Sequence, residues 1–168
     1  MREAFVFISR FLITFKVSIY RTMIQRIQTL WLALAGVAGF MTYKLPLWKG
    51  VQANGTVQEF LGPQSLILFA LIVIACLLSF TAIFLFKNRK LQKQLTLLAF
   101  LLTLIIVPLE YFMVESFKSA QQEKGVTFTQ NFWLIGAILP ILMVILLFLA
   151  YRGIRRDEKL IKSLDRLR

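Results

Sequence analysis

Long runs of apolar residues alternate with short polar segments along the chain. Four of these runs reach or approach the roughly 20 residues that a helix needs to cross a hydrocarbon core about 30 Å thick. The pattern therefore predicts four transmembrane helices, over residues of about 27–43, 65–86, 91–114 and 132–151. The second and fourth runs contain no charged residue, and the first is the shortest.

Composition agrees with a membrane environment. Of the 168 residues, 58% are hydrophobic and only 17% are charged, so folding in water would leave large apolar patches exposed. The chain has no histidine and one cysteine, Cys76, which excludes a disulfide, a Cys/His dyad and a zinc cluster within one chain. We therefore expect an integral membrane protein that is not an enzyme and that binds no cofactor or metal.

The basic residues indicate the orientation in the membrane. Most of the 20 Lys and Arg residues lie before the first run, between the second and third runs, and after the fourth. Because basic segments are retained in the cytoplasm during insertion, both termini and residues 87–93 are expected on the cytoplasmic side of a bacterial inner membrane. Neutral stretches separate the basic clusters, a pattern that does not favour nucleic-acid binding. Anionic lipid headgroups are the expected contacts.

The first 22 residues do not fit the four-helix pattern. They are apolar, but Arg10 and Lys16 interrupt them, and no small-residue cleavage site of a signal peptide follows. Two alternatives remain: a helix lying in the membrane interface, or a natural start at Met23. The chain is thus divided into an N-terminal extension or interfacial helix (1–22), a membrane domain (23–152) and a basic cytoplasmic tail (153–168).

Two polar connections carry strand patterns. Asn54-Gly55 lies between β-compatible residues and predicts a hairpin with a type I′ turn, in which both central residues have positive φ. The alternating segment 126–129 can add a third strand, which matters because a lone hairpin is marginal in water. The alternative is a disordered connection. The predicted fold is an all-α membrane protein, a bundle of four transmembrane helices with a small extracytoplasmic antiparallel β element.

The tail after Gly153 combines apolar residues at helical spacing with many charges. It predicts an amphipathic helix that continues the fourth span and binds anionic lipids or the cytoplasmic surface of a partner protein. Glu158 can also pair with Lys162 four residues later. The candidate lipid or partner contacts are Arg26, Arg152, Arg155, Arg156, Lys159 and Lys162.

Glu110 is the only acidic residue within a predicted span. An ionisable group at membrane depth points to proton coupling or polar pairing. Placed in the last turn or so of the third span, however, it would meet interfacial water and need no special role. Ala35 and Gly39 have the spacing of a helix-packing motif, either between subunits or among the chain's own helices. Hydroxyl side chains in the spans are expected to bond to their own helical carbonyls.

Two terminal motifs resemble a known family. These are Met23-Ile24-Gln25-Arg26-Ile27-Gln28 and the basic segment that begins Arg152-Gly153-Ile154-Arg155-Arg156-Asp157-Glu158-Lys159-Leu160. From residue 23 onward the chain resembles a bacterial domain-of-unknown-function family of small four-span membrane proteins. The resemblance implies the architecture and assigns no activity or site residue.

Two functions are consistent with these features. The first is a non-catalytic accessory or interaction subunit of a larger membrane assembly, bound through the basic ends and the sheet. The second is a small proton-coupled transporter that works as a homo-oligomer, with Glu110 as the coupling acid. An enzyme ranks third, because the spans contain no Asp, no His and no nucleophile beside a base.

Overall fold

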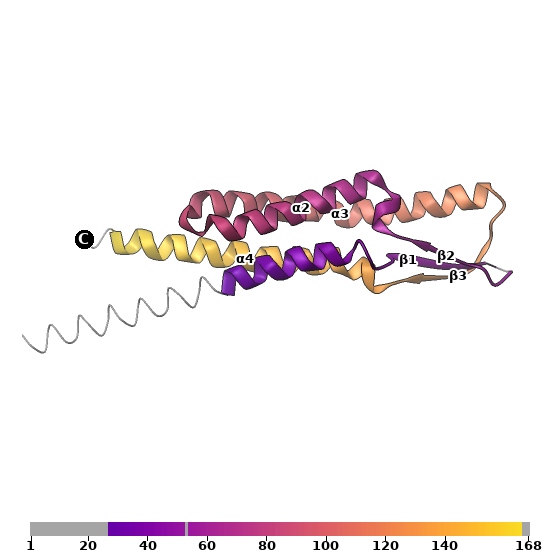
Figure 1. Ribbon diagram of the computed structural model, residues 1–168, viewed down its shortest axis with the longest axis horizontal. Helices are drawn as coiled ribbons and strands as arrows, with labels where there is room; N and C mark the ends of the chain where they lie inside the picture. Colours follow the sequence, from indigo (N-terminus) through magenta and orange to yellow (C-terminus); the bar gives the residue numbers. More distant parts are fainter. Residues whose placement is uncertain (1–26, 53, 166–168) are drawn as a thin grey trace, which may run out of the picture.

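The computed structural model describes residues 27–52 and 54–165. The N-terminal extension, Arg26 and the last three residues lie outside this part of the chain. Within it, helices run along the long axis of the molecule and a small sheet lies at one end (Figure 1). The helices are Ile27–Met41, α2 (Leu66–Phe84), α3 (Arg89–Glu123) and α4 (Ile135–Asp165), with short 3₁₀ turns at η1 (Gly62–Gln64) and η2 (Leu85–Lys87).

Helices α2 and α3 bury residues that are spaced three or four positions apart. This spacing keeps one narrow stripe of a helix against its neighbours, as in left-handed coiled coils. Small and polar residues occupy much of the stripe, which lets helix backbones approach closely, while the large apolar side chains point outward. The stripe of α2 is Leu68, Ile72, Ala75, Ser79 and Ala82, and that of α3 is Gln92, Thr96, Ala99, Thr103, Ile106, Glu110 and Val114.

The small residues of the Ile27–Met41 helix pack against the chain's own helices. A Cβ atom on Gly36 would lie 2.7 Å from the ring of Phe80 on α2. A Cβ atom on Gly39 would lie 2.4 Å from Cys76 Sγ and 2.9 Å from the end of Met143 on α4. At these two glycines the structure shows packing within one chain.

The predicted antiparallel sheet is confirmed. Its three strands are β1 (Trp48–Gln52), β2 (Val57–Phe60) and β3 (Phe128–Trp133), in the order β2-β1-β3. The predicted type I′ turn is wrong, because of its two central residues, Asn54 and Gly55, only Gly55 has a positive φ, at +80°. Gln52 N–H donates to Thr56 O across a three-residue loop, and Asn54 Oδ1 accepts from the N–H and hydroxyl of Thr56.

Two helix boundaries differ from the expected spans. Helix α3 continues to Glu123, well beyond the predicted end at residue 114. Its final turns pack on the sheet, where Phe117 lies 6.1 Å from Trp48 and 5.2 Å from Phe60, measured between ring centroids. Phe132 and Trp133, assigned to the fourth span from hydropathy, belong to β3 instead.

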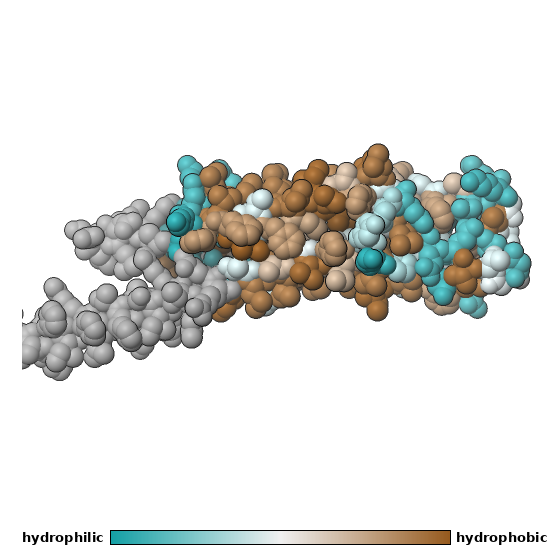
Figure 2. Space-filling model, viewed as in Figure 1, coloured by the Kyte–Doolittle hydropathy of each residue, from teal (hydrophilic) through white to brown (hydrophobic). Residues whose placement is uncertain are grey.

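An apolar belt surrounds the middle of the bundle. In Figure 2 hydrophobic residues cover this middle part, and hydrophilic residues gather towards both ends. Among the described residues, three helices are long and apolar enough to cross a membrane: Leu66–Lys87, Arg89–Glu123 and Ile135–Leu160. The apolar Ile27–Met41 helix is shorter than these three, so the finding supports a membrane protein and leaves a fourth span unconfirmed.

Candidate functional site

We call the end of the bundle that carries the three strands the sheet end, and the opposite end the tail end. An open groove of about 320 Å³ lies at the sheet end, between α3, the start of α4 and the last residue of β3. Its lining side chains are apolar except for three with a polar group: Glu110, Tyr111 and Trp133. The lining residues are Val107, Glu110, Tyr111, Trp133, Leu134, Ala137, Ile138 and Ile141.

Glu110 is held in this groove by its place on the buried stripe of α3. Only 4% of its surface is exposed, and its Oε1 atom is buried without a hydrogen-bond partner. Such an atom is unusual, because nearly all buried polar groups in native proteins are paired. Helix α3 continues beyond Glu110 to Glu123, so this residue is not in the last turn of the helix, although it remains near the predicted end of the third span at residue 114.

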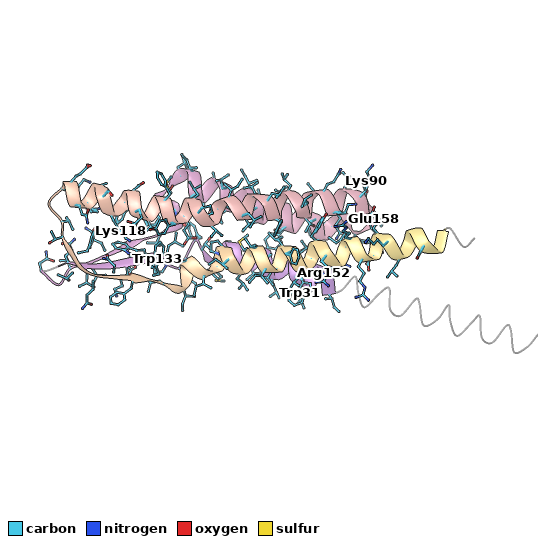
Figure 3. All side chains as sticks on the ribbon, turned by 180° about the vertical axis from the view of Figure 1, so that it is seen from behind. Trp31, Lys90, Lys118, Trp133, Arg152 and Glu158 are labelled. Atoms are coloured by element: carbon cyan, nitrogen blue, oxygen red, sulfur yellow. The ribbon has the colours of Figure 1, made fainter. Side chains whose placement is uncertain are left out.

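Aromatic and cationic side chains form a rim beyond the groove. The ring of Tyr111 stacks on that of Trp133, with centroids 5.8 Å apart and planes 16° apart. Lys118 Nζ lies 5.4 Å from the centre of the Trp133 ring and 5.3 Å from that of Trp48, and it pairs with Glu115 at 2.7 Å. Figure 3 shows Lys118 and Trp133 together at the sheet end. Tyr and Trp commonly lie at the boundary between lipid and water, so this rim resembles an interfacial belt.

At the tail end, two ion pairs join α3 to the extended α4. Arg89 Nη1 donates to Asp157 Oδ2 at 3.1 Å, and Lys93 Nζ donates to Glu158 Oε2. Asp157 is 6% exposed and lies on the buried stripe of α4. Both acids of this stretch of α4 therefore face α3.

The basic residues of the same stretch face outward. Helix α4 continues without interruption from Ile135 to Asp165, so the predicted tail and the fourth span form one helix up to that residue. Four of the candidate contacts are exposed on it: Arg152, Arg155, Arg156 and Lys159. We call these four residues the basic surface. The side chain of Lys162 and all of Arg26 lie outside the described part of the chain.

The hydroxyl groups of the bundle form hydrogen bonds with the backbone of their own helices. Ser79, Thr81, Thr96 and Thr103 each donate to the carbonyl oxygen four residues earlier, at 2.7–2.8 Å, which confirms the expectation from sequence. Among the described residues, no three His, Cys, Asp or Glu side chains come close enough to hold a metal ion.

The sequence did not identify several residues that form contacts at the sheet end and at the tail end. The partners in each ion pair, Arg89 with Asp157 and Lys93 with Glu158, lie more than 60 positions apart along the chain, and no local pattern joins them. Trp133 was counted with the fourth span, so its stacking on Tyr111 was not expected. One pattern was available: the steps of three and four that place Glu110 on the same stripe as Gln92, Thr96 and Thr103.

Comparison with known proteins identifies a family. Neither the curated proteins nor the solved structures contain a match to the chain. One family model matches residues 24–167, which is nearly the whole chain. The chain therefore belongs to the family described as Domain of unknown function (DUF4293).

Proposed function

We propose that the protein is a non-catalytic accessory subunit that docks onto a larger membrane assembly through its basic surface. One observation supports this function above all. Asp157 and Glu158 are paired with α3, whereas the neighbouring Arg152, Arg155 and Arg156 are exposed. Between residues 152 and 159, α4 thus turns both of its acids towards α3 and offers a strongly cationic face.

The proposal includes a definite orientation. We infer four spans, the first including the Ile27–Met41 helix, with both termini and the tail end in the cytoplasm of a bacterial inner membrane. Lys87 and Lys90, which are exposed, lie at the same end as the basic surface (Figure 3 labels Lys90). Their position agrees with the rule that basic segments stay on the cytoplasmic side.

The chemistry of the basic surface selects an acidic partner. Three of its four residues are arginines, and the planar guanidinium group can bind a carboxylate or a phosphate through two parallel hydrogen bonds. Anionic lipid headgroups at the inner leaflet satisfy the same chemistry and would help to orient the helix. The proposed protein partner therefore carries Asp and Glu residues near the membrane surface.

The test reverses the charge of two exposed residues and follows the partner. In the R155E/R156E variant, we expect proteins that co-purify with the wild type in a mild detergent to be lost, because the interface becomes repulsive. Mass spectrometry of the purified complex measures this loss. The matched control is Lys124→Glu, which changes an exposed charge at the sheet end. Unchanged co-purification in R155E/R156E would contradict docking through this surface.

Proton-coupled transport by a homo-oligomer is a second candidate, favoured by the buried position of Glu110 in the groove. Its test uses proteoliposomes with a potassium diffusion potential and an internal pH-sensitive dye. A transporter that uses this acid should carry protons in the wild type and lose that flux in the Glu110→Gln variant. Equal proton flux in the two proteins would rule out the coupling role.

A further inference from the structure

One polar group in the groove at the sheet end lacks a hydrogen-bond partner among the described residues. The carboxyl group of Glu110 lines the groove among mostly apolar side chains and accepts no hydrogen bond from the described residues. A buried oxygen without a donor is destabilising, and a ligand that supplies the donor would relieve this cost. The ligand must therefore combine a hydrogen-bond donor with an apolar body.

The depth of Glu110 narrows the choice of ligand. The carboxyl group lines the groove beside Ala137 and Ile138, within the first turn or so of α4. The stacked rings of Tyr111 and Trp133 lie at the adjoining rim. The donor is thus needed just inside an aromatic belt, where the polar heads of membrane lipids join their hydrocarbon tails.

The shape of the lining favours a hydrocarbon chain over a neighbouring helix. Close contacts between membrane helices use small residues, which let the backbones approach. Here Ala137 is the smallest side chain, and large ones surround it, including Ile138, which is 60% exposed, and Ile141, which is 48% exposed. A volume of about 320 Å³ is at the lower end of the roughly 300–1,000 Å³ of small-ligand sites.

We propose that this groove binds one hydrocarbon chain of a membrane amphiphile whose head–tail junction carries a hydroxyl group. The chain lies along Ile138 and Ile141, and the hydroxyl group donates a hydrogen bond to the carboxyl group of Glu110, which lines the groove. The rings of Tyr111 and Trp133 cover the junction from the water side. This site lies at the opposite end of the molecule from the basic surface, so the two proposals can fail independently.

The experiment compares two photoreactive probes on the full-length protein in phosphatidylcholine vesicles. One probe is a monoacylglycerol with a diazirine in its acyl chain, and the other is the same molecule with both hydroxyl groups methylated. In the wild type, we expect the hydroxyl probe to label peptides of α3 and α4 about tenfold more efficiently, the effect of one hydrogen bond. Glu110→Leu should remove this preference, because the acceptor is gone.

A second variant keeps the carboxyl group and fills the groove. Ala137→Phe should reduce labelling by both probes, whereas Leu98→Phe, on an exposed part of α3 outside the groove, should leave labelling unchanged. Equal labelling of the wild type by the two probes would overturn the proposal. So would unchanged labelling of Ala137→Phe, or cross-linking of the groove to a second polypeptide in place of the probe.

Discussion

Gly136 provides a close backbone contact at the sheet end. A Cβ atom at this position would lie 2.4 Å from the carbonyl oxygen of Pro46 and 2.8 Å from that of Leu45. Two residues earlier, the N–H of Leu134 donates to Leu47 O at 3.0 Å. The start of α4 is therefore fixed to the segment that leads into β1, and a larger side chain at residue 136 would force these backbones apart.

Replacing Gly136 by alanine should destabilise the protein more than the same change at Gly36. The added methyl group would meet rigid backbone at residue 136, whereas at residue 36 it would meet the ring of Phe80, which is 37% exposed and can move aside. We expect Gly136→Ala to lower the free energy of unfolding by about 1–3 kcal/mol, as overpacking commonly does. At Gly36 the gain in helix propensity, up to about 1 kcal/mol, offsets much of the cost. Thermal unfolding of the two variants in detergent measures the difference, and equal loss would contradict this explanation.

At the scale of single residues, the sequence identified Glu110 but not its surroundings. Its rarity in an apolar run was sufficient to select it. Its burial depends on which side of α3 faces α4, and its groove depends on Trp133, which reaches the site from a strand. Contacts between residues so far apart in the chain leave no local pattern to read.

At the scale of elements, α3 shows why hydropathy locates a span better than it locates a helix end. Residues 115–123 are mostly polar, so an apolar window stops before them. Several of them, including Glu115, Lys118 and Ala120, are nevertheless good helix formers, and Phe117 packs on the sheet. The apolar belt was predictable, because a helix that crosses a hydrocarbon core needs a run of apolar residues. The extension was not, because its stability comes from contacts with strands elsewhere in the sequence.

The pair formed by Arg89 and Asp157 should stabilise the contact between α3 and α4. The side chain of Asp157 is 8% exposed and that of Arg89 is 21% exposed, so losing one partner leaves a largely buried charge unpaired. We expect Asp157→Leu to lower the free energy of unfolding by about 1–3 kcal/mol, below the range for fully buried pairs because Arg89 retains some contact with water. Chemical unfolding in detergent micelles measures the loss.

The double variant provides the control for this prediction. R89L/D157L removes both charges, so it should be more stable than Asp157→Leu alone. Glu123→Gln, at the exposed end of α3, should have little effect. A double variant less stable than the single one would show that the ion pair is not the source of the loss.

At the scale of the whole molecule, the two ends differ in secondary structure and in exposed charge. The sheet end combines strands, aromatic rings and a groove, whereas the tail end is a projecting helix with exposed cations. The apolar belt between them and the three membrane-length helices support the proposed orientation, in which the two ends lie on opposite sides of a bilayer.

Single cysteines can test this separation after Cys76 has been replaced by alanine. Asn54→Cys is in the exposed loop between β1 and β2, and Lys159→Cys is on the basic surface. In cells with a permeabilised outer membrane, a membrane-impermeant maleimide should label Asn54→Cys at once. Lys159→Cys should react only after the inner membrane is broken. Labelling of both variants in intact cells would contradict the proposed orientation.

The length of α3 has a mechanical consequence. Its 35 residues span about 50 Å, some 20 Å more than the hydrocarbon core of a bilayer. Phe117, near the end of the helix, packs against Trp48 and Phe60, so the last turns of α3 are joined to the strands. Since the start of α4 also contacts the segment that leads into β1, a change in the tilt of either helix would have to move the strands with it.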